Sequence, residues 1–592
     1  MLLAERMNKV RVYVSKSYID DVMFRLGEAG MIHQTEIRES LKDLEGYVHP
    51  IESSERLFKL SSILSRIEML ISSLKLENET IPEKAKVERF LSDKDLERLE
   101  AESTRIEEEH SRIVSQLTEF EKQEGTEEKT EQISELTAEL DKLATESKVQ
   151  LLVNRERIEV ARKIEEAKTR VGETSRTFVI EGWVPEKKME GLKRVVQEAS
   201  FGFCAFVSLE IKPQEGHGGE EAKAPPTLLR NPRIAYVYEK IATAFGVPNY
   251  REVDPSVFML FSFPIIFGLM FGDVGQGSVL LVLTLLLYML KRRNLKTSEI
   301  FSYLIQGSPL LVMCSISAIF FGFLYGEFFG FEMYNEEAAH YFPFLEEGFR
   351  SLTGISLSHT IQGASHSLEA AISSILGLPI RIPFPFSPFE DPSTMLLLSI
   401  YVAIVQISFG LVLGLINEVR NRRFKQAVIG PGLWLWFYWS FAYLLIRYGS
   451  KIFSVIFERM DIMGIYLVLP ASAMILAQVA VHKMDGFGHA LESLIASISN
   501  TISYGRILAL ALAHGAFSRI LLMFLGLEGM LMMIVGFVMW AAFTFLLIMC
   551  FEFLLSFIHT LRLHWVEWFL KFYSGNGFQY RPFLITRRFT MV

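Results

Sequence analysis

Residues 487–525 read FGHALESLIASISNTISYGRILALALAHGAFSRILLMFL, a mostly apolar stretch that carries Glu492, Arg506 and His514. A continuous helix of this length would extend about 58 Å, nearly twice the roughly 30 Å thickness of a hydrocarbon core. We therefore expect a membrane helix that tilts steeply or projects beyond the bilayer. At 100° per residue, Glu492 and Arg506 lie about 40° apart around the helix axis, and His514 lies about 80° from Arg506.

A second polar stripe is predicted in the last apolar stretch, which contains Glu552, His559 and Arg562. Glu552 and His559 differ by about 20° around the axis, and Arg562 lies about 80° from Glu552. Ionisable side chains at membrane depth cost several kcal/mol unless they meet partners or water, so each is a candidate functional group. Two facing stripes of this kind would form a discontinuous polar path through lipid.

A simpler alternative is that Arg506 and Glu552 pair and lock two helices together. A lock needs one partner per charge, whereas six ionisable groups spread over two overlong helices favour an ion path, with Arg506 lacking a dedicated partner of its own. His564 and Glu567 follow in the sequence and are expected at the membrane interface. The candidate ion-translocation residues are Arg506, Glu492, His514, Glu552, His559 and Arg562.

The composition divides the chain into a charged N-terminal part and an apolar C-terminal part. The chain has 592 residues, of which 50% are hydrophobic and 12% aromatic. Residues 1–250 hold 38 Lys and Arg against 47 Asp and Glu, whereas residues 251–592 hold 22 against 21. The net charges of −9 and +1 give no basic surface for nucleic acid. We therefore predict a cytoplasmic domain at 1–250 and a membrane domain at 251–592.

Eight apolar stretches are predicted to cross the membrane as helices. Basic loops after the second, fourth and sixth stretches (KRRNLK, EVRNRRFKQ and HKMDGFGH) fall on one face, the cytoplasmic one by the positive-inside rule. We expect a multi-pass protein of the cell membrane with its N-terminal domain and C-terminus in the cytoplasm. The loop Gly326–Pro392 is then external, with an amphipathic helix at Ser356–Leu376. The stretches centre near Pro264, Leu283, Ser315, Val405, Phe437, Pro470, Ala509 and Phe543.

The hydrated half contains two small α/β pieces at residues 8–40 and 177–211. In the first, an alternating strand is followed by an amphipathic helix that Gly30 stops; in the second, Pro185 opens the helix. Between them, residues 54–170 show heptad-like spacing that predicts a long antiparallel coiled-coil arm, turning near Glu124 and Gly125. Its many charged residues are interpreted as a solvated helix surface.

Several functions are excluded by what the chain lacks. The segment 212–227 predicts a flexible linker, and its GHGG is not followed by the Lys-Ser/Thr of a phosphate loop. No GxxxxGK[ST] motif occurs, so the chain alone should not hydrolyse ATP. The three cysteines show no metal-ligand or disulfide spacing. We expect no catalytic residues, no cofactor and no metal, and the charged N-terminus argues against a signal peptide.

The stretches SNTISYGRILALALAH (499–514) and FEFLLSFIHTLRLHWVEWFLKFYSGNGFQYRPF (551–583) closely resemble the last two membrane helices of a known family. This is the large membrane stator subunit of rotary V-type and archaeal-type ATPases, called a in eukaryotes and I in prokaryotes. The motifs occur in the family order over nearly the whole chain. Supporting motifs are EGWVP (181–185), LLRNPRIAYVYE (228–239), GLMFGDVGQG (268–277) and FGFLYGEFFG (321–330).

The resemblance implies a role for each candidate residue. Arg506 would meet the buried carboxylate of a rotor ring, and the other five residues would line or gate two aqueous half-channels. The implied partners are the rotor proteolipid (c or K type) ring, peripheral stalk subunits of E and G type, the V1 or A1 ATPase sector through those stalks, a rotor-connecting subunit of d or C type, and the lipid bilayer. The coupling ion would be H⁺ or Na⁺, and no nucleic acid is expected.

The predicted fold class is an α+β cytoplasmic N-terminal domain with a long antiparallel coiled-coil arm, followed by an all-α polytopic membrane domain of eight transmembrane helices, the last two long and tilted. The chain is shorter than many relatives, which fits the prokaryotic subunit I branch. Residues 76–150 lack the strand pattern of a second globular lobe. Two alternatives remain: a self-contained secondary transporter, and a structural membrane tether.

Overall fold

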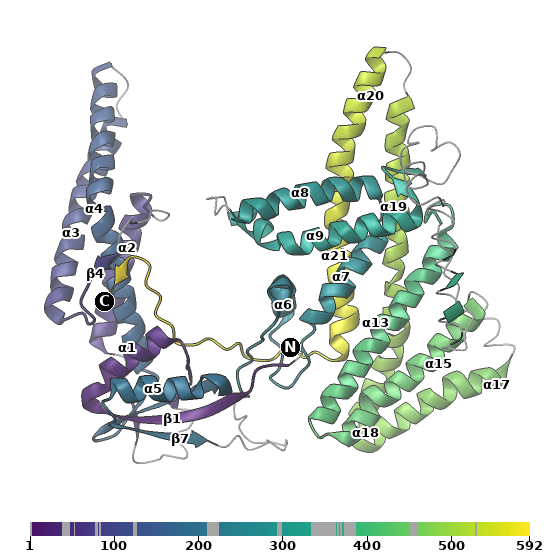
Figure 1. The fold of residues 1–592 in the computed structure, drawn as a ribbon, viewed down its shortest axis with the longest axis horizontal. Helices are drawn as coiled ribbons and strands as arrows, with labels where there is room; N and C mark the ends of the chain where they lie inside the picture. The colour runs from purple at the N-terminus through teal and green to yellow at the C-terminus, as the bar shows by residue number, and fades with distance from the viewer. Residues whose placement is uncertain are drawn as a thin grey trace. The chain divides into compact units, whose positions relative to one another are not determined.

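The computed structural model describes residues 3–37, 48–51, 54–76, 81, 84–121, 127–209, 224–292, 299–332, 386–449, 459–526 and 530–591, with isolated positions between 363 and 374 (Figure 1). The chain forms two compact units. The head unit comprises Glu5–Pro226 and Gln579–Val592, and the helical unit comprises Met1–Ala4 and Thr227–Phe578.

The sheet of the head unit interlocks two βαβ pieces. The first is β1 (Met7–Ser15), α1 (Ile19–Ala29) and β2 (His33–Gln34), and the second is β6 (Thr177–Pro185), α5 (Met189–Ala199) and β7 (Cys204–Leu209). Strand β1 pairs antiparallel with β6 and β7, while β2 pairs with β6. Each piece completes the other's sheet, as in a split βαβ fold. The sequence indicated two separate pieces because the pairing joins distant residues, such as Arg11 and Glu181.

The core of the sheet follows from the predicted strand and helix patterns. Val10, Val12 and Val14 alternate along β1 and are buried against α1 and α5. Helix α1 ends at Gly30, whose φ of 57° is left-handed and whose N–H donates to the carbonyl of Leu26 at 3.0 Å. Glycine suits this end because it has no Cβ to strain the backbone. The predicted helix stop at Gly30 is confirmed.

Three helices form a second core in the head unit. They are α2 (Glu55–Ser73), α3 (Asp93–Glu121) and α4 (Glu127–Lys168), and α4 packs against both of the others (Figure 1). Between α3 and α4, the Glu102 carboxylate accepts hydrogen bonds from Gln150 at 2.8 Å and Asn154 at 3.3 Å. The helical arm is therefore present, while its supercoiling stays a prediction. The expected turn at Glu124 and Gly125 lies outside the described residues.

The C-terminal tail belongs to the head unit. The backbone N–H groups of Phe583 and Ile585 donate to Ile32 and Gly27 at 2.8 Å each. Further on, β10 (Thr590–Met591) pairs parallel with β4 (Ala85–Lys86). These contacts place residues 579–592 with the N-terminal part of the chain, although the predicted membrane domain included them. A two-residue strand carries no pattern from which this pairing could be read.

Glu156 of α4 holds this tail in place. Its carboxylate accepts backbone hydrogen bonds from Arg588 and Phe589 at 2.8 Å each and from Thr590 at 3.0 Å, and a fourth from the Thr590 hydroxyl at 2.6 Å. Burial alone would raise the pKa of Glu156, but these hydrogen bonds outweigh burial and hold the pKa below its ordinary value. We call Glu156 with residues 588–590 the tail clasp.

The helical unit is dominated by apolar helices. In order they are α7 (Ser256–Met270), α8 (Val274–Arg292), α9 (Glu299–Tyr325), α13 (Pro392–Arg420), α15 (Leu433–Tyr448), α18 (Leu469–Ser503), α19 (Gly505–Leu522), α20 (Met530–Phe543) and α21 (Phe553–Arg562). A shorter helix, α6 (Tyr236–Phe245), packs on α7, with the rings of Tyr238 and Phe263 6.4 Å apart. This packing places residues 227–250 in the helical unit, so the division lies before the predicted boundary at residue 250.

Five helices in the described part of the chain are long and apolar enough to cross a membrane. They are Ser302–Tyr325, Pro392–Arg420, Phe424–Tyr448, Met460–Leu522 and Met530–Lys571. Two further apolar helices, Ser256–Met270 and Val274–Leu290, are shorter. The centres of all eight predicted spans fall within these seven helices, but a count of eight crossings stays a prediction.

The longest helical run is interrupted at Lys483. Its backbone adopts φ 55° and ψ −130°, which no helix tolerates. Just beyond it, a Cβ on Gly486 would approach the carbonyl oxygen of Gln478 to 2.2 Å, so only glycine permits the close return of the chain. The break falls inside the predicted cytoplasmic loop HKMDGFGH. Most of the predicted linker 212–227 and of the predicted external loop Gly326–Pro392, with the amphipathic helix Ser356–Leu376, lies outside the described residues.

Candidate ion-translocation site

Two π-helical runs shape the last long helix, Met530–Lys571. They span Thr544–Glu552 and Leu563–Trp568 and flank α21. π-Helical turns are rare, occur frequently at functional sites and shift the angular position of every residue beyond them. The first run ends at Glu552, and the second contains Glu567. Both carboxylates are buried in the protein and face α19.

Arg506, at the start of α19, pairs with Glu567. Its Nη1 donates to Glu567 Oε1 at 2.9 Å and to the carbonyl of Ser503 at 3.2 Å. The Arg506 side chain keeps 23% of its surface exposed, whereas Glu567 keeps only 2%. The guanidinium is therefore held from the protein interior while part of it still faces outward.

The exposed side of Arg506 lies on an apolar groove of about 520 Å³. Ile495, Ile498 and Ile502 line the groove together with two serines. These residues recur every three or four positions and so share one face of the helix with Arg506. A cation at the edge of an apolar groove can meet an anion brought by another chain, because that anion need not enter the protein interior.

Hydrogen bonds hold both the segment that carries Glu567 and the start of α19, which carries Arg506. His564 is fully buried, with Nε2 2.8 Å from the Ser262 hydroxyl of α7 and Nδ1 2.8 Å from the Thr560 carbonyl. Tyr504, beside Arg506, donates to Gln406 of α13 at 2.9 Å. These contacts hold the second π-helical run and the start of α19 in register.

His514 and Glu552 form a second contact, fully enclosed by the protein. Nδ1 of His514 lies 3.3 Å from Oε2 of Glu552, and their side chains keep only 2% and 4% of their surfaces exposed. His514 is two turns beyond Arg506 on α19, which is about 12 Å along the axis. The Phe271 ring covers the imidazole, with ring centroids 5.0 Å apart. The two base–carboxylate contacts therefore lie at two different levels of the same helix.

Asp273 organises the backbone beside the enclosed contact. Its carboxylate accepts hydrogen bonds from the backbone N–H groups of Gln276 at 2.8 Å, Phe329 at 3.0 Å and Gly330 at 3.0 Å. The Gln276 side chain in turn donates to the Ser518 hydroxyl at 3.2 Å, one turn beyond His514. Asp273 therefore clamps the start of α8 to the segment after α9 and supports the wall next to His514. It was quoted within a sequence motif but was not singled out.

The remaining predicted site residues lie toward the surface. Glu492 keeps 80% of its side chain exposed and lies 4.0 Å from His489. His559 is half-buried and interacts electrostatically with Arg506 and Arg562, and Arg562 is exposed. The structure thus brings His514 to Glu552 and places His559 near Arg506, while Glu492 lies more than three turns before Arg506 on an exposed face.

Two sequence expectations need correction. Arg506 was expected to have no partner within the chain, but Glu567 pairs with it. His564 and Glu567 were expected at the membrane interface with their polar ends in water; both are buried among the helices of the bundle, and their depth in the membrane stays a prediction. The second π-helical run explains the error, because it turns this segment inward relative to a regular α-helix. The alternative lock between Arg506 and Glu552 is not the observed pairing, since Glu552 contacts His514 instead.

The model of the V-type ATPase 116kDa subunit family matches residues 31–342 and 473–585, which is more than half of the chain. Among curated proteins, A-type ATP synthase subunit I of Methanothermobacter thermautotrophicus is 27% identical over 446 residues, covering 75% of this chain and 57% of that protein. The corresponding subunit of Methanocaldococcus jannaschii is 26% identical, with 74% and 60% covered. V-type proton ATPase subunit a1 of Arabidopsis thaliana is 24% identical, with 69% and 58% covered. The chain thus matches about three fifths of the length of these relatives.

Proposed function

Because the chain belongs to the V-type ATPase 116kDa subunit family, we propose that it is the membrane stator subunit of a rotary V-type or archaeal-type ATPase. In this role it faces a rotor ring of proteolipid subunits and guides H⁺ or Na⁺ past that ring. One observation carries the proposal: the guanidinium of Arg506 lies on an exposed apolar groove and is held from behind by Glu567. That arrangement suits a cation that meets a carboxylate delivered by another chain.

The proposed mechanism uses the fixed charge of Arg506. A rotor carboxylate must be neutral to pass through lipid, because a charge there is strongly disfavoured. On reaching Arg506 it is favoured in its ionised form by Coulomb attraction and releases its cation. Arginine keeps its charge under all physiological conditions, so it cannot relay a proton across the short direct path. Arg506 and its groove would thus separate the place where the rotor carboxylate binds its cation from the place where it releases it.

Two half-channels are proposed on opposite sides of Arg506. His514 and Glu552, with Asp273 behind them, would line one half-channel, about 12 Å along α19 from Arg506. Glu492 would line the other half-channel, on the side of Arg506 where the helix is interrupted at Lys483. His559 and Arg562 would gate access to Arg506, since His559 interacts with both arginines. The enclosed and exposed settings of these groups support this division.

The same proposal assigns eight membrane crossings. The break at Lys483 would divide the run Met460–Leu522 into two antiparallel spans, and α7 and α8 would supply the two shortest. The head unit and the C-terminus would then both lie in the cytoplasm, as the positive-inside rule requires. This assignment fits the tail, which packs within the head unit.

The head unit would anchor the stator to the rest of the machine. Its helical arm, α2 to α4, would bind peripheral stalk subunits and through them the soluble ATPase sector, and a rotor-connecting subunit would complete the contact with the ring. The relatives are named as subunits of an A-type ATP synthase and of a V-type proton ATPase, which supports such an assembly. We propose no catalytic step for this chain, since it would move ions only together with the rotor.

Arg506→Ala in the reconstituted complex tests the proposal. Removing one preorganised charge at a reacting centre typically lowers the rate about 10²–10³-fold, and we expect ATP-driven ion pumping into proteoliposomes to fall that far. Arg519→Ala on the same helix is the matched control, because Arg519 pairs peripherally with Glu390 at 3.8 Å. The control should pump normally, and both variants should assemble with the ring.

Two outcomes would contradict the proposal. Normal pumping by a correctly assembled Arg506→Ala complex would favour the structural tether. Ion flux through the purified chain alone in liposomes, without a rotor ring, would favour a self-contained secondary transporter.

A further inference from the structure

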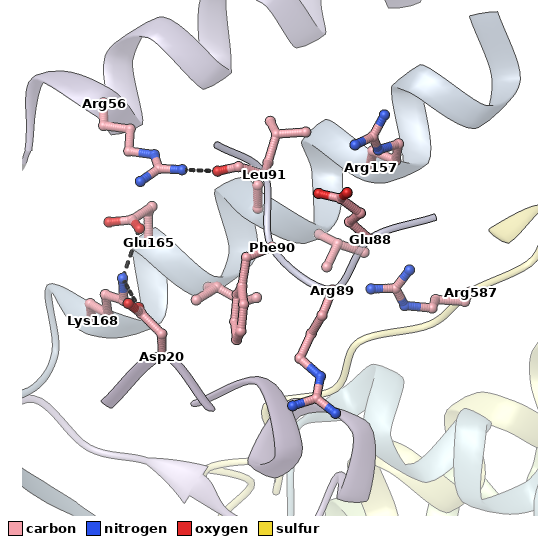
Figure 2. A pocket seen from close by; sticks show the side chains of 13 residues that line it. Asp20, Arg56, Glu88, Arg89, Phe90, Leu91, Arg157, Glu165, Lys168 and Arg587 are labelled. Carbon is pink, nitrogen blue, oxygen red and sulfur yellow. Dashed lines mark hydrogen bonds and ion pairs between the residues drawn. The ribbon is translucent and has the colours of Figure 1, made fainter. Parts of the chain in front are cut away.

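A small pocket of about 100 Å³ opens in the head unit at the base of the arm (Figure 2). It is formed by α1, α2, α4, the segment after β4 and the C-terminal tail. Cationic side chains surround it: Arg56, Arg89, Arg157, Lys168 and Arg587. The carboxylates that share the lining are Asp20, Glu88 and Glu165. The pocket therefore has an excess of positive charge.

Two of the three carboxylates are already used. Asp20 and Glu165 both contact the Lys168 ammonium, the latter at 2.8 Å, as Figure 2 shows. Arg89 is neutralised from outside the pocket by Asp21 at 2.8 Å. The third carboxylate, Glu88, belongs to an exposed residue. Local pairing thus leaves Arg157 and Arg587 without a paired carboxylate among the described residues, while Arg56 pairs only with the exposed Asp93 at 3.7 Å.

Arg157 and Arg587 are two like charges beside the pocket, and the carboxylates of Glu28 and Glu156 also act on Arg587. Burial lowers the pKa of Arg587, and the nearby charge of Arg157 lowers it further against the pull of Glu28 and Glu156. The Nε of Arg587 is buried without a hydrogen-bond partner, although its Nη1 donates to Thr590 at 3.1 Å. Among the described residues, neither guanidinium has a carboxylate within ion-pair distance. A buried unpaired donor beside a second guanidinium can be satisfied by a bound water or by an anion, and an anion would also offset the two positive charges.

Arg56 supplies a third group on the opposite side of the pocket. It donates to the carbonyl of Leu91, and its Nε is buried without a hydrogen bond, 3.7 Å from the exposed carboxylate of Asp93. Figure 2 shows Arg56 across the pocket from Arg157 and Arg587. Guanidinium groups present planar pairs of N–H donors that match the oxygens of phosphate and carboxylate. A volume of about 100 Å³ is roughly that of three liquid waters, which is enough for a small ion.

We propose that this pocket binds one small tetrahedral oxyanion of the phosphate class, bridging Arg157 of the arm and Arg587 of the tail. The anion would join two segments far apart in the sequence and would reinforce the tail clasp, which lies on the same helix at Glu156. The pocket belongs wholly to the head unit and contains no proposed ion-path residue, so its binding stands or falls independently of the stator role.

The test measures binding of radiolabelled inorganic phosphate to the purified full-length chain in detergent, by equilibrium dialysis at fixed ionic strength. We expect one saturable site for which sulfate competes and chloride does not. Arg157→Gln and Arg587→Gln should each weaken binding about tenfold or more, because each removes a charge-assisted bidentate contact. Glu88→Gln should strengthen binding severalfold, since it removes the remaining lining carboxylate.

Arg176→Gln provides the matched control, because Arg176 is exposed in the head unit outside the pocket. It should leave phosphate binding unchanged. Arg587→Lys tests whether weaker binding comes only from detachment of the tail. It keeps the positive charge but lacks the planar pair of N–H donors of a guanidinium. We expect it to bind phosphate with intermediate affinity. As a second readout, phosphate should slow proteolysis within residues 579–592 in the unmodified chain but not in Arg157→Gln.

Glycerol 3-phosphate distinguishes the source of the anion. If it binds as tightly as phosphate, the natural ligand is a phosphomonoester on a larger molecule; if only phosphate and sulfate bind, it is the free ion. Absence of a saturable site at millimolar phosphate would overturn the proposal. So would equal binding by the parent chain, Arg157→Gln and Arg587→Gln, because the anion would then lie elsewhere.

Discussion

The two base–carboxylate contacts of the last helices differ in what surrounds them. Arg506 and Glu567 meet at 2.9 Å, with the arginine partly exposed on an apolar groove. His514 and Glu552 meet at 3.3 Å with both side chains almost fully enclosed. In the proposed assembly the first contact would be open to a carboxylate of another chain, whereas the second is enclosed by the protein. We therefore expect the pairing of Arg506 with Glu567 to be exchangeable and the pairing of His514 with Glu552 to be permanent.

This difference predicts opposite responses to removal of the carboxylate. A buried polar group that loses its partner suffers the full desolvation penalty, whereas in the proposed assembly Arg506 can still meet a rotor carboxylate on its exposed side. Loss of the enclosed carboxylate should therefore lower stability first. Loss of the Glu567 carboxylate should instead change the rate of ion pumping first.

The largest expected effect is on stability, for Glu552→Ala. This change leaves His514 enclosed without its carboxylate, and we expect a loss of about 3 kcal/mol in the free energy of unfolding. Thermal denaturation of the purified complex in detergent measures it. The double variant His514→Ala with Glu552→Ala should recover part of the loss, because no buried group is then left unpaired. If the single and double variants were equally unstable, the contact would not be the cause.

Asp273→Asn should cause the next largest loss in the free energy of unfolding. The amide keeps one oxygen for two of the three backbone donors, but its NH₂ group then faces the N–H of Gly330. We expect a loss of about 1–3 kcal/mol. Increased hydrogen exchange at residues 327–332 would locate the damage. Ser393→Ala is a useful control, since it removes a hydrogen bond of 2.6 Å to Asp391 at an exposed helix start.

Glu567→Gln sharpens the contrast at the open contact. We expect a smaller loss of stability than in Glu552→Ala, because the amide oxygen can still accept the hydrogen bond that Arg506 donates. Arg506 would then attract a rotor carboxylate more strongly, by about 1 kcal/mol, which would slow its release and ion pumping roughly fivefold. Measuring pumping and denaturation on the same preparation separates the two effects. Large instability with normal pumping would reverse the assignment of open and closed contacts.

Glu156 extends the comparison to a buried carboxylate held by hydrogen bonds rather than by a paired base. Because its pKa is lowered in the folded protein, the stabilisation is present above the ordinary value of 4.5 and is lost as the pH falls through the lowered value. Proteolysis of residues 579–592 should therefore accelerate below about pH 4.5. In Glu156→Gln the tail should be cleaved faster, by roughly fivefold, at neutral pH. Acid acceleration of equal size in both chains would implicate another group.

Much of this arrangement could be predicted from the sequence. The polar stripes identified Arg506 and the contact partners His514 and Glu552, because ionisable residues stand out in apolar helices. Helical periodicity also predicted the helices α2 to α4, and strand alternation followed by an amphipathic helix predicted the α/β pieces. Glu567 was missed because the sequence gives no sign of the π-helical run that turns it toward Arg506. The interlocked sheet was missed because pairing between β1 and β6 is set by tertiary packing rather than by local pattern.

The tail has a consequence for biosynthesis. Strand β4 and Glu156 leave the ribosome long before their partners, which lie up to 505 positions later, beyond the apolar helices of the described residues. At 5–20 residues per second, that delay lasts about 25–100 s. During this interval the nascent chain exposes an unfinished edge that only a copy translated past its final apolar segment can complete. Prematurely terminated chains would keep that edge open to chaperones and proteases, so the fold itself distinguishes them from finished ones.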